Sequence, residues 1–160
     1  MDHDNYDDKY IIEVLMDTNT IAMIGASANW NRPSFFAMKY LQKKGFRVIP
    51  VNPGVAGQNI LGETAVAALD EIGEPIDMVD IFRNSVVAGS ITDEAIEKDA
   101  KIVWMQLGVR NDDAAKRAED AGLRVVMNRC PKIEFARLNG ELSWHGVNSN
   151  VITSKRRRLT

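Results

Sequence analysis

Short runs of apolar residues alternate along this chain with segments of helical periodicity, and this alternation limits the possible fold more than any other feature. The runs are rich in Val, Ile and Met and show little polar alternation, so each predicts a strand that is buried on both faces. They cover residues 20–24, 47–51, 76–82, 102–107 and 124–127.

Helical patterns separate these runs, and one more precedes the first run. Pro33 opens the first of the separating helices and Gly45 ends it, which fits the usual preferences of proline and glycine at helix ends. The separating helices are expected at 33–44, 65–72, 92–99 with Thr92 as N-cap, and 111–121 with Asn111 as N-cap. An N-terminal helix is expected at about 7–17, with Tyr10, Val14 and Ile11 on its apolar side.

This alternation of strands and helices predicts a parallel sheet with helices on both faces. Right-handed crossovers leave few topologies, so we expect a Rossmann-like α/β fold with an open sheet of about five strands. The length of 160 residues suits one domain. We expect an N-terminal helix in residues 1–18, the Rossmann-like domain in 19–146, and a disordered basic tail in 147–160.

Composition restricts the compartment and the partners. The net charge of −2 favours neither nucleic acid nor an anionic membrane. The single cysteine, Cys130, rules out an intramolecular disulfide and fits a reducing cytoplasm. The N-terminus is acidic where a signal peptide would be basic, and no apolar run approaches the roughly 20 residues of a membrane span. We expect a cytoplasmic protein with a small-molecule ligand; a homodimer or a protein partner stays open.

The strand at 20–24 runs directly into a turn of small residues and a helix start. Such a junction directs backbone N–H groups and the helix dipole at one spot, and therefore suits a phosphate group. Arg32 adds a guanidinium that can make paired contacts with phosphate oxygens, and Ser34 adds a hydroxyl. A plain structural turn is the alternative. The residues of the predicted site are Gly25, Ala26, Ser27, Arg32, Pro33 and Ser34.

This turn departs from the dinucleotide fingerprint Gly-x-Gly-x-x-Gly. Aligned on Gly25, the chain has Ser27 and Trp30 at the second and third glycine positions. The second strand ends at Asn52 and Pro53, without the carboxylate that holds an NAD ribose. The missing acid favours a ligand with a further phosphate near its ribose, because a carboxylate would repel that phosphate. An NADP-binding oxidoreductase-type or redox-sensing domain stays an alternative.

Six short motifs in this order resemble the small stand-alone CoA-binding domain proteins. These in turn are similar to the N-terminal domain of the succinyl-CoA synthetase alpha subunit. The resemblance covers about residues 19–138. The motifs are Gly25-Ala26-Ser27, Arg32-Pro33-Ser34, Pro50-Val51-Asn52-Pro53, Asp80-Ile81-Phe82-Arg83, Trp104-Met105-Gln106-Leu107-Gly108 and Met127-Asn128-Arg129-Cys130.

The resemblance implies coenzyme A as the ligand. It places the CoA phosphates on the first turn, Arg32 and Ser34, and the adenosine end beside the end of the second strand. The further residues that it implies are Asn52 and Pro53 at the adenosine end, Phe82 and Arg83 along the nucleotide or pyrophosphate, Gln106 and Gly108 along the pantetheine arm, and Asn128, Arg129 and Cys130 at the thiol end. Asn128 stands where many relatives are expected to have aspartate, which argues against an acid role there.

Catalysis is not expected from this chain alone. Succinyl-CoA synthetases use a phosphorylated histidine in a separate domain and a nucleotide-grasp subunit. This chain has only His3 and His145, neither in a recognisable catalytic motif, and no metal-ligand spacing. We therefore expect non-catalytic binding of CoA or an acyl-CoA, and an interaction protein with an empty pocket is a further alternative. Cys130 is a candidate for a mixed disulfide with the CoA thiol, although a buried free cysteine is the commoner case.

Overall fold

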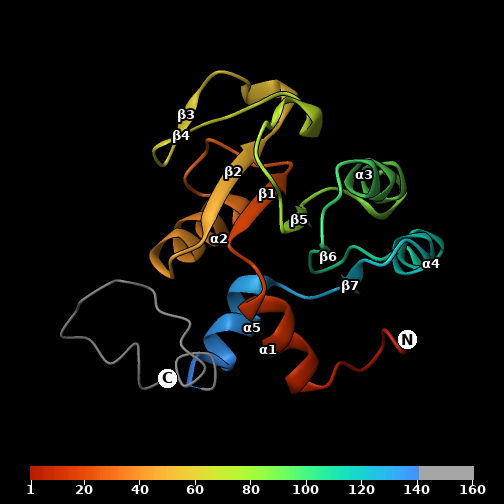
Figure 1. The fold of residues 1–160 in the computed structure, drawn as a ribbon. Coiled ribbons are helices and arrows are strands. Elements are labelled where there is room, and N and C mark those ends of the chain that lie inside the picture. The colour runs from red at the N-terminus through yellow and green to blue at the C-terminus, as the bar shows by residue number, and fades with distance from the viewer. Residues whose placement is uncertain (141–160) are drawn as a thin grey trace.

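The computed structural model describes residues 1–140 and contains a five-stranded parallel sheet in the order β2-β1-β5-β6-β7 (Figure 1). This is the predicted Rossmann-like fold. The chain adds β2 on one side of β1 and then crosses to the other side for β5, so the strand order reverses beside β1. The strands are β1 (Thr20–Ile24), β2 (Arg47–Val51), β5 (Met78–Ile81), β6 (Ile102–Met105) and β7 (Arg124–Val126).

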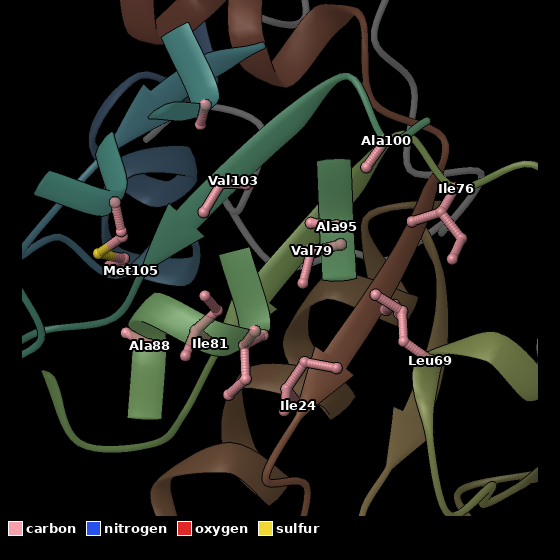
Figure 2. Close-up of a cluster of buried hydrophobic side chains, with 14 of the residues drawn as sticks. Ile24, Leu69, Ile76, Val79, Ile81, Ala88, Ala95, Ala100, Val103 and Met105 are labelled. Atoms are coloured by element: carbon pink, nitrogen blue, oxygen red, sulfur yellow. The ribbon is translucent and has the colours of Figure 1, made fainter. Parts of the chain in front are cut away.

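Helices cover both faces of the sheet, as the apolar strands require. Figure 1 shows α3 and α4 on one side and α1, α2 and α5 on the other. Neighbouring residues of one strand belong to opposite layers: Met78 lies in the layer of α1, α2 and α5, whereas Val79 lies in the layer of α3 and α4 (Figure 2). The helices are α1 (Asp8–Met16), α2 (Pro33–Lys43), α3 (Ser85–Glu97), α4 (Asp112–Asp120) and α5 (Pro131–Arg137).

The N-terminal segment closes the sheet at its β7 edge. The Tyr10 hydroxyl donates to the Val125 carbonyl at 2.8 Å and accepts from the Val125 N–H at 3.1 Å. The Tyr6 hydroxyl accepts from the Met127 N–H at 2.8 Å. Side chains therefore satisfy backbone groups that an edge strand would otherwise expose to pairing with another chain. In α1 itself Val14 and Ile11 are buried as expected.

The predicted helix at 65–72 is wrong. The short strands β3 (Asn59–Ile60) and β4 (Glu63–Thr64) form a hairpin, and a 3₁₀ turn, η2 (Leu69–Glu71), follows it. Val66 instead bonds with the β2 edge, where its N–H donates to the Pro50 carbonyl and its carbonyl accepts from the Asn52 N–H. Pairing with a strand distant in sequence thus outweighs the local helical pattern.

Two further helix expectations need correction. The helix predicted at 92–99 begins earlier, at Ser85, with Asn84 as its N-cap. Thr92 lies in the helix interior, where its hydroxyl donates to the Ala88 carbonyl at 2.7 Å. Helix α5 after Cys130 was not expected. The predicted tail at 147–160 and His145 lie outside the described residues. None of the helices in residues 1–140 is both long and apolar enough to span a membrane.

Candidate functional site

The first turn lies against the loop that follows β5. Gly25 has φ +85°, and a Cβ atom placed there would lie 2.5 Å from the Phe82 carbonyl oxygen and 2.9 Å from Cδ of Arg83. Only glycine combines this conformation with such a close approach. The Arg83 stem therefore crosses the turn, and the loops after β1 and β5 meet where the strand order reverses.

Side-chain hydrogen bonds hold this turn together. Ser34 is buried in the first turn of α2, and its Oγ accepts from the Ser27 N–H at 3.0 Å. Ser27 Oγ accepts from the Asn29 N–H at 3.0 Å. Asn52 Nδ2 donates to the Ala26 carbonyl at 2.9 Å, which ties the loop after β2 to the same turn. The structure thus brings together three predicted segments, although the Ser27 N–H is occupied by Ser34.

Arg32 and Arg83 differ from the other arginines of residues 1–140, because neither has a carboxylate within ion-pair distance. The guanidinium groups of the other six each pair with an acid. These pairs are Arg47–Glu74, Arg110–Asp112, Arg117–Asp93, Arg124–Asp17, Arg129–Glu134 and Arg137–Glu134. A guanidinium left without an acid partner remains available for an anionic ligand.

The loops at the carboxyl ends of the strands, which form the carboxyl edge of the sheet, contain basic residues and no acidic ones. The loop residues that follow the five strands contain no aspartate or glutamate, although the chain has 22 acidic residues. The same loops contain Arg32, Arg83, Arg110, Arg129 and Lys132. The loop segments are residues 25–34, 52–54, 82–85, 106–110 and 128–132. Arg110 and Arg129 pair with acids that lie outside these segments, so Arg32, Arg83 and Lys132 supply the remaining positive charge of these loops.

A pocket of about 560 Å³ lies at this edge beside Arg83. Its walls are mostly apolar, and its volume is typical of sites for small molecules. Its lining residues are Pro33, Phe82, Arg83, Asn84, Gln106, Leu107 and Val109. Asn84, Leu107 and Val109 were not singled out individually from the sequence, although their position at or just after the end of a predicted strand was the signal that could have found them.

Two buried polar side chains, of which Gln106 lines this pocket, have oxygen atoms without a hydrogen-bond partner among residues 1–140. Asp80 is fully buried in the central strand, and both of its carboxylate oxygens are unpaired. Burial raises the pKa of Asp80 well above its ordinary value, because desolvation disfavours the charged form. The Oε1 atom of Gln106 is also buried and unpaired.

The loops after β6 and β7 are fixed to one another. Asn128 has φ +56°, and its Oδ1 accepts from the Gly108 N–H at 2.8 Å. Asparagine tolerates this left-handed conformation better than most residues. Trp104 Nε1 donates to the Arg129 carbonyl at 2.8 Å, and the Arg129 guanidinium lies 5.2 Å from the centre of the Tyr6 ring. Asn128 and Arg129 therefore already have structural partners.

Cys130 lies directly before α5 and is 7% exposed. Its burial is typical of a free cysteine that packs as a small apolar residue. The mixed disulfide with a CoA thiol stays a prediction.

The chain is similar to known proteins in sequence. Residues 19–136 match the family model described as a CoA binding domain. The chain is 36% identical over 126 residues to the protein YneT of Bacillus subtilis, an alignment that covers 79% of this chain and 92% of YneT.

Solved structures share the fold. A protein from Thermus thermophilus is 35% identical with a TM-score of 0.79, and the match covers 83% of this chain and 99% of that one. A hypothetical protein from Pyrococcus horikoshii is 37% identical with a TM-score of 0.80, covering 86% and 95% of the two chains. The acetyl-coenzyme A synthetase 1 of Ca. Korarchaeum cryptofilum shares only the fold, at 19% identity and a TM-score of 0.63, over 73% of this chain and 27% of that one.

Proposed function

Because the chain belongs to the CoA-binding domain family, we propose that it binds coenzyme A or an acyl-CoA without catalysing a reaction. The ligand lies at the carboxyl edge of the sheet, where the loops after β1, β2 and β5 meet. Arg32 and Arg83 contact its phosphate groups, and the pocket beside Arg83 receives part of the remaining molecule.

The main support is that Arg32 and Arg83 have no acid partner within residues 1–140 and lie in strand-end loop segments that contain no aspartate or glutamate. Coenzyme A has a pyrophosphate and a ribose 3′-phosphate, and both need cationic partners and no nearby carboxylate. Arginine suits this task because its planar donors can make paired contacts with phosphate oxygens. Asn52 after β2 is neutral, so it does not repel the additional phosphate as a carboxylate would.

The remaining assignments belong to the same proposal. The first-turn backbone of Gly25 and Ala26 supports the phosphate site, together with Ser27 and Ser34, whose mutual hydrogen bond opens for the ligand. Pro53 borders the adenosine end. Phe82 lies along the nucleotide or its pyrophosphate, Gln106 and Gly108 line the path of the pantetheine arm, and Asn128, Arg129 and Cys130 surround the thiol end.

A thermal-shift panel of CoA, acetyl-CoA, NAD, NADP and ATP tests the proposal. A ligand at 100 times its Kd adds about 2.7 kcal/mol to the free energy of unfolding. For a chain of this size that corresponds to a rise in Tm of roughly 5–11 °C. We expect CoA and acetyl-CoA to give this rise. Selective stabilisation by NADP would instead support an oxidoreductase-type or redox-sensing domain, and no stabilisation would support an interaction protein.

Arg32→Ala locates the phosphate site. It should remove most of the CoA shift, because it deletes an unpaired guanidinium at the first turn. Arg124→Ala is the matched control, since Arg124 begins β7 at the opposite edge of the sheet and pairs with Asp17 at 2.9 Å. If both variants keep the full shift, the phosphates bind elsewhere.

A further inference from the structure

Asp80 and Gln106 lie on the same face of neighbouring strands. Asp80 is directly opposite Trp104 in the parallel register of β5 and β6. Gln106 follows Trp104 by two residues, and its N–H continues the ladder by donating to the Ile81 carbonyl at 3.2 Å. Because side chains alternate between faces, Gln106 and Asp80 are one diagonal step apart on the layer of α1, α2 and α5.

The two side chains have complementary needs. Within residues 1–140, Oε1 of Gln106 is buried and lacks a donor, and both oxygens of Asp80 are buried and lack a partner. A buried carboxylate without a cation is strongly disfavoured, so Asp80 is held as the neutral acid, which has one O–H to donate. An unpaired buried acceptor is also costly, and one hydrogen bond between the two groups would satisfy Oε1 of Gln106 and the hydroxyl of Asp80.

We propose that neutral Asp80 is a positioning residue that donates a hydrogen bond to Oε1 of Gln106 when a ligand fills the pocket. Gln106 lines that pocket and is 9% exposed. With its carbonyl turned inward, its amide N–H groups face the ligand. The pocket then selects a carbonyl oxygen, the acceptor found in the amides of a pantetheine arm and in a thioester. This inference rests on the proposed function.

The test distinguishes binding of the pantetheine arm of CoA from binding of its nucleotide. Titration calorimetry measures the Kd of CoA and of adenosine 3′,5′-bisphosphate, which has the nucleotide phosphates without the arm. Asp80→Leu should weaken CoA about tenfold, the effect of one lost hydrogen bond, and leave the bisphosphate within about twofold. Asp80→Asn, whose neutral amide can still donate to Gln106, should restore wild-type binding of both ligands.

Gln106→Leu keeps the test decisive if Asp80→Leu does not fold. It should raise the Kd of CoA and leave the Kd of the bisphosphate unchanged. The double variant Gln106→Leu, Asp80→Asn should have the same Kd for CoA as Gln106→Leu alone. Equal weakening of both ligands by Asp80→Leu or Gln106→Leu would overturn the inference, as would a loss in Asp80→Asn as large as in Asp80→Leu. If the wild-type protein binds neither ligand, the proposed function itself fails.

Discussion

Replacing Gly25 with alanine tests how closely the loops after β1 and β5 approach one another. Two costs arise in this variant. An L-residue in the left-handed region costs about 1–2 kcal/mol. The new methyl group would also lie 2.5 Å from the Phe82 carbonyl oxygen, and relieving such an overlap costs about 1–3 kcal/mol more.

Gly57 offers a matched control. It has the same φ of +85°, but, its two chain neighbours aside, no heavy atom of residues 1–140 lies within 4 Å of a Cβ added there. Gly57→Ala therefore carries the backbone cost alone, and both variants share the entropic effect of alanine on the unfolded chain. We expect Gly25→Ala to lose about 1–3 kcal/mol more free energy of unfolding than Gly57→Ala.

Equilibrium urea denaturation measures this difference through the midpoint at an unchanged m-value. The same variants report on the site: Gly25→Ala should lose the CoA shift, whereas Gly57→Ala should keep it. Equal losses of stability would refute the reasoning, because they would mean that the loop after β5 moves aside without cost.

Three further predictions concern the burial and hydrogen bonding of polar groups. Burial raises the pKa of Asp80 in the folded protein. Between the ordinary carboxyl pKa of about 4 and that raised pKa, the carboxyl is ionised in the unfolded chain and neutral in the folded protein, so stability should fall as pH rises. The loss is at most about 1.4 kcal/mol per pH unit relative to Asp80→Asn and ends once the pH passes the raised pKa; Tm measured from pH 4 to 8 checks it. Tyr6→Phe leaves the buried Met127 N–H unpaired, so it should lower the free energy of unfolding by about 1–3 kcal/mol in urea denaturation. Tyr40→Phe is the control: it removes a hydroxyl that has no hydrogen bond in residues 1–140, and should cost far less. Asn128→Ala loses a hydrogen bond and keeps a positive φ, so a drop in Tm is expected; an unchanged Tm would show that the loops after β6 and β7 hold without it.

Local signals explain why the strands were predictable. β1 and β2 have the predicted bounds, because buried parallel strands are short apolar runs that end at turn residues. The same signals failed at residues 65–72, where the backbone of Val66 pairs with the edge of β2. They also placed the start of α3 too late, because Thr92 has the residue type of an N-cap but bonds within the helix.

The sequence predicted the order of strands and helices. From that order it also predicted that the loops with Arg32 and Arg83 lie at the carboxyl edge of the sheet. Tertiary structure alone decided which of those cations remain unpaired. Arg32 and Arg129 both follow a strand in the sequence, yet Arg129 meets Glu134 and the Tyr6 ring, whereas Arg32 meets no acid in residues 1–140. The neighbours of a side chain come from segments far apart in the chain, so the packing of helices and the N-terminal segment determines them, and local residue patterns do not.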